Sequence, residues 1–308
     1  MPAVLIGNPN AGRKAGLATN STTVEEAIAA LDAVGLAPTV WLTEGPGDAT
    51  ALARQAVADG AETVIAAGGD GTVHEVAQAL VGTEATLGVM PLGSVMNIAR
   101  TLGIARDLAE AAQVIRAGRL LRMDVGEVNG RYFLEFAGVG IDAAIGPLAQ
   151  QLDCGRWASV GELLRALWTY RPRKMTLTAD GVTETVQAAS IVVANTPYYG
   201  PAVELTPEAK VDDRQFDVKV FGRFSLRELA LYAFQIARGA RPYNPKVQYL
   251  RARTVTVTAS QPLAAHADFE PAGTTPVTFR LVPRALKVWA NPALWEGPEP
   301  TAISAAAS

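Results

Sequence analysis

The chain has 308 residues, 49% of them hydrophobic, and a formal net charge of −3. It can therefore bury the core of one large or two ordinary domains, and it lacks the basic excess that nucleic-acid binding needs. With a single cysteine, Cys154, and only His74 and His266 as histidines, neither an internal disulfide nor a Cys/His zinc site is expected. We see no apolar run of the roughly 18–20 residues that span a membrane, and no signal peptide, which predicts a cytoplasmic protein.

The first 119 residues alternate short apolar runs with helical patterns. This alternation is typical of a mostly parallel sheet covered by helices on both faces. Each helical pattern ends near a glycine suited to close a helix, at Gly35, Gly60 and Gly82. An α/β domain over residues 1–119 is therefore predicted, with strands at residues 3–7, 38–43, 63–67 and 87–91.

From residue 120 the pattern changes to strands joined by turns. The pairs Asn129-Gly130 and Asp180-Gly181 lie between strand-like runs, which is a strong signal for a β-hairpin. Residues 120–284 are thus predicted to form an antiparallel β-domain, interrupted by two arginine-flanked helices at 157–170 and 225–239. Residues 292–308 show no periodicity and are predicted to be disordered.

The sequence GGDGT, residues 68–72, joins a strand-like run to a helical pattern. We expect the helix to begin near Thr72, with Thr72 and Glu75 as a capping box. Free backbone N–H groups at such a helix start favour a phosphate, and a carboxylate beside phosphates makes sense with Mg²⁺ between them. Asp70 is therefore a candidate magnesium ligand, although it could instead only structure the turn.

Two further glycine-bearing turns follow strands, at residues 7–16 and 91–103. All three turns belong to the carboxyl edge of the predicted sheet, where α/β proteins bind ligands. The candidate nucleotide-binding residues on these turns are Asn8, Gly12, Gly68, Gly69, Asp70, Gly71, Thr72, Gly93, Ser94 and Asn97.

The motifs NPNAG, GGDGTVHEV, PLGS…NIARTLGI, FAGVGIDA, NTPYYG and DFEP follow one another between residues 3 and 291. In this order they resemble the diacylglycerol kinase catalytic family, which includes bacterial lipid kinases, sphingosine kinases and ceramide kinases. GGDGT alone is shared with NAD kinases and phosphofructokinases, whereas the combination is specific. The resemblance implies an α/β domain followed by a β-sandwich, with the last strand, residues 285–291, returning to the first domain.

The resemblance also implies ATP and Mg²⁺ as cofactors and a lipid acceptor at the membrane surface, and it leaves a homodimer open. The sequence DFE stands where the family has D-G-E, so Asp268 would be the general base and Glu270 part of an acidic network with Asp70. The acidic turn with Asp212, Asp213 and Asp217 could hold a structural Mg²⁺ or simply be solvated. His266 is an alternative base or a strand histidine without a role.

Two departures from the family pattern favour alternative functions. Phe269 replaces a glycine, and Met96 replaces a polar residue. If they disable transfer, the protein is a weak or inactive nucleotide- or lipid-binding sensor. A soluble-substrate kinase, such as an NAD kinase, is a further alternative. In the leading interpretation, the protein is an ATP-dependent kinase of a diacylglycerol-like or sphingoid lipid. Helices 157–170 and 225–239 then either dock on anionic membranes or only cap the β-domain, with their arginines in solvent.

Overall fold

The four predicted apolar runs form the parallel strands of an α/β domain in the computed structural model, which describes residues 2–14, 17–18, 20–143, 159–200, 203–240 and 244–294. These strands are ordered β4-β1-β5-β6. They are β1 (Ala3–Gly7), β4 (Thr39–Leu42), β5 (Thr63–Gly68) and β6 (Thr86–Pro91), and a short hairpin of β2 (Arg13–Lys14) and β3 (Leu17–Ala18) follows β1.

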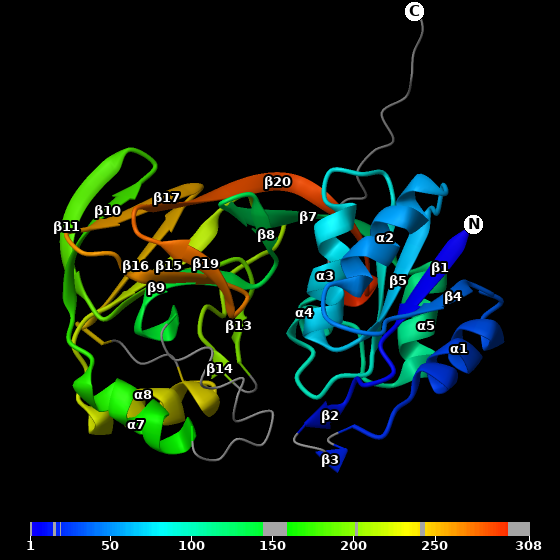
Figure 1. The fold of residues 1–308 in the computed structure, drawn as a ribbon, viewed down its shortest axis with the longest axis horizontal. Coiled ribbons are helices and arrows are strands. Elements are labelled where there is room, and N and C mark those ends of the chain that lie inside the picture. Colours follow the sequence, from blue (N-terminus) through cyan, green and yellow to red (C-terminus); the bar gives the residue numbers. More distant parts are fainter. Residues whose placement is uncertain are drawn as a thin grey trace, which may run out of the picture.

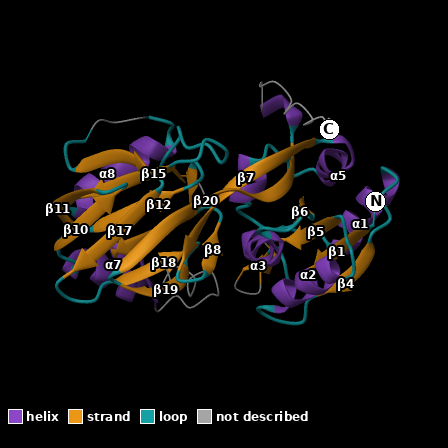
Figure 2. Cartoon of the chain, turned by 90° about the horizontal axis from the view of Figure 1, so that it is seen from above, coloured by secondary structure: helices purple, strands orange, loops and turns teal. Residues whose placement is uncertain are grey.

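Two pairs of helices lie on opposite sides of this sheet, α1 with α5 and α2 with α3 (Figure 2). The predicted closing glycines Gly35, Gly60 and Gly82 all have φ near +80°, a conformation that glycine adopts without steric cost. The helices are α1 (Val24–Ala33), α2 (Asp48–Ala58), α3 (Asp70–Leu80), the short α4 (Asn97–Thr101) and α5 (Leu108–Ala117).

The start of α3 corrects one prediction. The helix begins at Asp70 with Gly69 as its N-cap, and no side chain caps it. Thr72 therefore lies within the first turn. Glu75 accepts hydrogen bonds from the backbone N–H groups of Gly47 and Ala49, at 3.0 and 3.2 Å, so it caps the neighbouring helix α2 rather than its own.

The rest of the chain forms a sandwich of two antiparallel sheets (Figure 1). Asn129 and Asp180 have positive φ, as the two predicted hairpin turns require. The first sheet is continuous through β20 with the parallel strands of the α/β domain, in one 10-stranded sheet. Its part in the sandwich holds β7 (Arg119–Val128), β8 (Arg131–Phe133), β10 (Arg173–Ala179), β11 (Val182–Ala188), β17 (Thr254–Ala259) and β20 (Val277–Ala290). The second has the order β16-β15-β12-β9-β18-β19, formed by β9 (Phe136–Gly140), β12 (Ser190–Ala194), β15 (Phe216–Phe221), β16 (Val247–Ala252), β18 (Ala264–Ala267) and β19 (Glu270–Thr274).

Aromatic side chains fill the space between the two sheets. The ring of Phe133 lies 5.5 Å from that of Phe216 and 6.3 Å from that of Phe279, and all three are fully buried. Outside the second sheet lie the small hairpin of β13 (Tyr198–Tyr199) and β14 (Val203–Glu204) and the helices α7 (Ser159–Thr169) and α8 (Leu226–Ala237). The predicted helix 157–170 is thus described only from Ser159.

The long strand β20 connects the two domains (Figure 2). Its first half pairs with β17 of the sandwich, and its second half pairs in parallel with β6, where Lys287 is opposite Thr86. The last strand therefore returns to the α/β domain, as the family resemblance implies. The start of the predicted disordered tail is corrected, because Pro292–Leu294 form a 3-10 helix. The rest of that tail, residues 295–308, lies outside the described residues, as does Cys154.

Candidate active site

The three glycine-bearing turns meet at the carboxyl edge of the parallel sheet. A Cβ atom at Gly93 would lie only 2.6 Å from Cα of Gly69. The turns at residues 68–72 and 91–103 are therefore too close together for a side chain at position 93. Gly12 has φ +73°, and a Cβ there would lie 2.7 Å from the carbonyl oxygen of Asn20. The side chain of Asn20 donates to the carbonyl of Leu92 at 3.1 Å, which connects the turn at residues 7–16 to the turn at residues 91–103.

The first turn of α3 leaves space suited to a phosphate. The side-chain amide of Asn8 donates to Oγ1 of Thr72 at 3.3 Å, and a Cβ at Gly68 would collide with the same hydroxyl. By contrast, no atom lies within 4 Å of a Cβ built at Gly71. The N–H groups of a first helical turn have no partner within the helix and favour an anion. These residues therefore fit the phosphates of a nucleotide.

Asp70 contacts the start of α4, the helix that begins at Asn97. One oxygen of the half-buried Asp70 accepts from the backbone N–H of Ile98 at 3.3 Å. The side-chain oxygen of Asn97 is buried and has no hydrogen-bond partner, while the backbone carbonyl of Ser94 accepts from Arg106. Carboxylate and amide oxygens are the ligands that Mg²⁺ prefers, so this donor set fits a magnesium nucleotide.

His74 extends this group across the domain boundary. It lies one turn after Asp70 on the same face of α3. Its Nε2 atom lies 3.0 Å from Oε1 of Glu135 and 3.6 Å from Oδ2 of Asp268, both residues of the sandwich. Asn97 donates to the other oxygen of Glu135 at 2.8 Å. The site is therefore a cluster built by both domains, in which Glu135 and Asp268 are buried and Asp70 and His74 are partly buried.

Backbone amides hold the carboxylate of Asp268 in place. Its Oδ2 accepts from the N–H of Leu134 at 2.7 Å, and its Oδ1 accepts from the N–H groups of Glu135 and Phe136, each at 3.0 Å. Three fixed donors orient this carboxylate more tightly than side-chain partners could, because the backbone segment between β8 and β9 cannot rotate away.

The cluster shifts the pKa of both Glu135 and His74 upward. Burial raises the pKa of Glu135 to about 7, although the nearby imidazole works against this. Burial alone would lower the pKa of His74, but Asp268, Glu135 and Asp70 outweigh it and raise the value to about 9. At neutral pH, His74 is therefore a cation among three acidic side chains.

The turn after Asp268 explains why a glycine suits position 269. Asp268 and Phe269 have φ of +47° and +65°, in the left-handed region that glycine adopts most easily. The ring of Phe269 lies 4.7 Å from that of Phe136 and 5.7 Å from that of Tyr199. Met96, the other departure from the family pattern, is buried and also has a positive φ, of 57°.

The remaining sequence candidates lie apart from this cluster. Glu270 is exposed on β19, whereas Glu135 contacts Asp268 through its backbone N–H and shares His74 with it. Asp213 pairs with Arg251, and Asp217 accepts a hydrogen bond from Tyr249. Within the described ranges, no three His, Cys, Asp or Glu side chains gather as a group that could hold a metal ion. Asp212 lies on the loop before β15.

His266 forms a separate buried pair. Its Nε2 atom lies 2.9 Å from Oδ2 of Asp142, and both side chains are almost fully buried. Gly138 makes this contact possible, because a Cβ there would lie 2.4 Å from the same oxygen of Asp142. The ring of His266 also stacks 6.1 Å from that of Phe269, so the pair packs against the aromatic group beside Asp268.

Sequence reasoning missed His74 and Glu135 as site residues. His74 carries a usable signal, since residues four apart on a helix share a face and Asp70 was already a candidate. Glu135 carries a second signal, as a charged residue within the apolar run YFLEFAGVG. A charged side chain inside a buried strand run needs a partner, and here the partner comes from the other domain.

Comparison with known families assigns both domains. Residues 2–128 match the diacylglycerol kinase catalytic domain, and residues 136–290 match the YegS C-terminal NAD kinase beta sandwich-like domain. The chain therefore belongs to the diacylglycerol kinase catalytic family, a family of kinases, and carries a YegS-type second domain.

Individual proteins support the same assignment. The chain is 28% identical over 293 residues to a protein named diacylglycerol kinase in Staphylococcus aureus strains JH9 and Newman, a match that covers 94% of this chain and 92% of each relative. A crystal structure of a diacylglycerol kinase from Bacillus anthracis has the same fold, with a TM-score of 0.75 and 24% identity over 96% of this chain and 98% of the other. A second structure from that organism gives a TM-score of 0.76.

Proposed function

We propose that the protein transfers the γ-phosphoryl group of ATP, with Mg²⁺, to a hydroxyl group of a diacylglycerol-like or sphingoid lipid. The observation that carries this proposal is the cluster in which His74 joins Asp70 at the phosphate-sized turn to Glu135 and Asp268 of the sandwich. The names of the relatives, diacylglycerol kinases, support a lipid as the acceptor.

Each part of the cluster has a role in this proposal. When bound, ATP supplies the phosphoryl group, and Mg²⁺ neutralises charge on its phosphates. Asp70 would hold the ion, and the turns around Gly12, Gly69 and Gly93 would bind the phosphates. Asp268 would accept the proton of the lipid hydroxyl, held in position by the three backbone amides. Glu135 and His74 position Asp268 and set the charge around it.

A lipid acceptor requires contact with a membrane surface. None of the described helices is both long and apolar enough to cross a bilayer. The helices α7 and α8 lie below the sheets in Figure 1 and expose Trp168, Leu231 and Phe234. Arg165, Arg227 and Arg238 are exposed on or beside the same helices. Near an anionic bilayer each such residue contributes about 1 kcal/mol, which suits reversible docking.

A purified full chain, incubated with labelled ATP, Mg²⁺ and a lipid extract, tests the proposal. The expected product is a labelled lipid that requires Mg²⁺. A parallel reaction with NAD⁺ as the acceptor distinguishes a soluble-substrate kinase. Nucleotide binding without transfer to any acceptor would overturn the proposal and favour an inactive nucleotide- or lipid-binding sensor. The observation that supports a sensor is the aromatic packing of Phe269 beside Asp268.

A further inference from the structure

The chain crosses from the first sheet of the sandwich to the second at Leu134 and Glu135. These residues lie between β8, which pairs with β7, and β9, which pairs with β12 and β18. The backbone N–H groups of both residues and of Phe136 donate to Asp268. Consecutive N–H groups that point to one carboxylate form an anion-binding concavity. The position of Asp268 therefore depends on how residues 134–136, the crossing segment, are held.

Asn195 holds the other side of the crossing segment. It directly follows β12, and its side-chain nitrogen donates to the carbonyls of Leu134 and of Asp124 on β7, each at 2.9 Å. Its backbone N–H donates to the carbonyl of Glu135 at 2.8 Å. Because an amide nitrogen carries two protons and both are used here, the side chain is fixed in one orientation. The carbonyls of the segment thus point to Asn195, while its N–H groups point to Asp268.

The contact between Asn195 and the crossing segment is shielded from solvent. Asn195 is 1% exposed and Leu134 is fully buried, so water does not replace the amide as a donor. A buried carbonyl without a donor is costly, and the segment therefore relies on this side chain. Asn195 is also the first residue of the motif NTPYYG, residues 195–200, which the proposed chemistry has not used so far.

We propose that Asn195 is a positioning residue for Asp268. Its amide holds the carbonyl side of the crossing segment and thereby keeps the three backbone donors aligned with the carboxylate. This inference rests on the proposed function, in which Asp268 accepts the proton of the acceptor hydroxyl. A shift of about 1 Å in a reacting group can lower a rate about 100-fold, so loss of this support should lower kcat.

Hydrogen exchange of the full chain tests the positioning without an assay of activity. Asn195→Ala removes both side-chain donors and keeps the backbone N–H. The amide protons of residues 134–136 should exchange at least about tenfold faster in this variant than in the wild type, since one lost hydrogen bond corresponds to that factor. Rates are compared with those of the amides of β10, which report any loss of stability of the whole domain.

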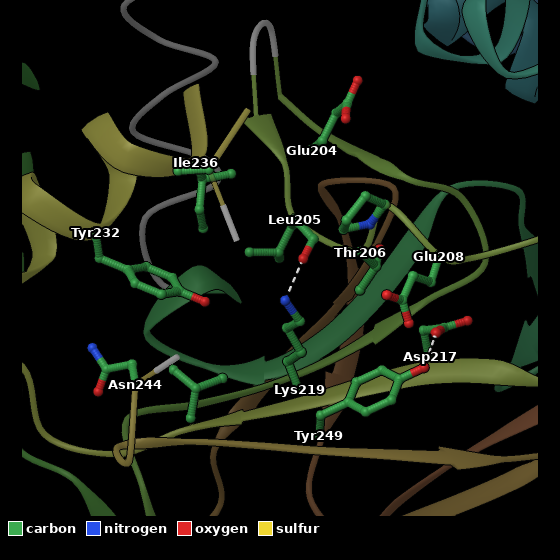
Figure 3. Close-up of a pocket in the computed structure, with 13 residues that line it drawn as sticks. Glu204, Leu205, Thr206, Glu208, Asp217, Lys219, Tyr232, Ile236, Asn244 and Tyr249 are labelled. Atoms are coloured by element: carbon green, nitrogen blue, oxygen red, sulfur yellow. Dashed lines mark hydrogen bonds between the residues drawn. The ribbon is translucent and has the colours of Figure 1, made fainter. Parts of the chain in front are cut away.

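Thr206→Val is the matched control. Thr206 lies on the loop after β14, at the wall of a cavity outside the second sheet (Figure 3). Its buried side chain donates to the carbonyl of Thr196, the residue next to Asn195, at 2.9 Å. Valine has nearly the same shape and removes this hydrogen bond, but it leaves both contacts of the Asn195 amide. Exchange at residues 134–136 should stay within about twofold of the wild type, as expected for a change below the value of one hydrogen bond.

Steady-state kinetics of lipid phosphorylation tests the consequence for the reaction. Asn195→Ala should lower kcat at least about tenfold and leave KM for ATP nearly unchanged, because the nucleotide-binding turns lie in the other domain. Thr206→Val should keep both values near those of the wild type. Circular dichroism confirms the fold of each variant. If Asn195→Ala does not fold, Asn195→Ser takes its place, since a hydroxyl can still donate to one carbonyl.

Four results would each overturn the inference. They are unchanged exchange at residues 134–136 in Asn195→Ala, equal increases in Asn195→Ala and Thr206→Val, a wild-type kcat in a folded Asn195→Ala, and failure of both Asn195 variants to fold, which would assign Asn195 to the core alone. A wild type that phosphorylates no lipid would instead contradict the proposed function, and the exchange rates would then decide whether Asn195 positions Asp268.

Discussion

The Nε2 atom of His74 lies 3.0 Å from Oε1 of Glu135, and this ion pair joins helix α3 of the α/β domain to the sandwich. One turn further along α3, the side-chain amide of Gln78 donates to the carbonyl of Tyr132 and accepts from its N–H, at 2.8 and 3.0 Å. Asp70, His74 and Gln78 therefore lie on one face of α3, and this face contributes to both the candidate site and the domain interface.

The raised pKa values of His74 and Glu135 predict that stability falls as the pH rises. The pKa of His74 is raised from 6.5 to about 9, and that of Glu135 from 4.5 to about 7. The folded state therefore binds more protons than the unfolded state. The contribution of His74 is fully present below pH 6.5 and is lost as the pH rises through 9; at about 1.4 kcal/mol per pKa unit, this change amounts to about 3 kcal/mol.

Denaturant titrations at pH values from 4 to 9.5 measure this effect. His74→Gln should flatten the dependence between pH 6.5 and 9, and Glu135→Gln should flatten it mainly between pH 4.5 and 7. If the dependence of stability on pH is the same in His74→Gln as in the wild type, the cluster does not raise the pKa of His74.

Asp268→Asn and Glu135→Gln should differ in their effect on stability. An amide at position 268 cannot accept from all three backbone donors, so the free energy of unfolding should fall by about 1–3 kcal/mol. Glu135→Gln keeps an oxygen for Asn97 and should cost less.

Lipid phosphorylation should be lost in Asp268→Asn even where the variant is fully folded, while nucleotide affinity stays nearly intact. A folded Asp268→Asn that retains turnover would exclude this residue as the base.

Variants of Phe269 separate backbone strain from packing. Both Phe269→Gly and Phe269→Ala lose the ring contacts with Phe136 and Tyr199, so both should be less stable than the wild type. Only glycine relieves the φ of +65°, so Phe269→Gly should be the more stable of the two by about 1 kcal/mol. Thermal unfolding gives the order, and an alanine variant as stable as the glycine variant would show that the backbone there carries no strain. Higher lipid turnover in Phe269→Gly than in the wild type would support the sensor.

Membrane docking should depend on the arginines of α8. Arg227→Gln with Arg238→Gln should weaken co-sedimentation with anionic vesicles by about 1 kcal/mol per arginine. Arg54→Gln with Arg116→Gln, which removes two exposed arginines from the other domain, is the matched control. Binding that does not depend on anionic lipid or on salt, or equal losses in both double variants, would argue against docking through this helix.

Local signals in the sequence predicted most of the fold. The Asn129-Gly130 and Asp180-Gly181 turns and the glycines that close the helices act through their own backbone angles, which need no distant partner. The three turns at the carboxyl edge were also predictable, because the chain direction of a parallel sheet places them together.

The contacts between the two domains could not be read from the sequence. His74 and Glu135 are 61 positions apart, and their pairing exists only because the domains pack together. The same reason accounts for Glu75, which fits a capping box for α3 by spacing but caps α2, because α2 lies beside it. Residue spacing along one helix carries no information about the neighbouring helix.

The rate of lipid phosphorylation in Asp70→Asn tests the central claim most directly. Asp48→Asn is the matched control, because Asp48 is likewise the first residue of a neighbouring helix, α2. We predict that Asp70→Asn loses turnover at least about 100-fold while remaining folded, since it removes the charge that would hold Mg²⁺, and that Asp48→Asn stays close to the wild type. Equal turnover in Asp70→Asn and Asp48→Asn would contradict the account.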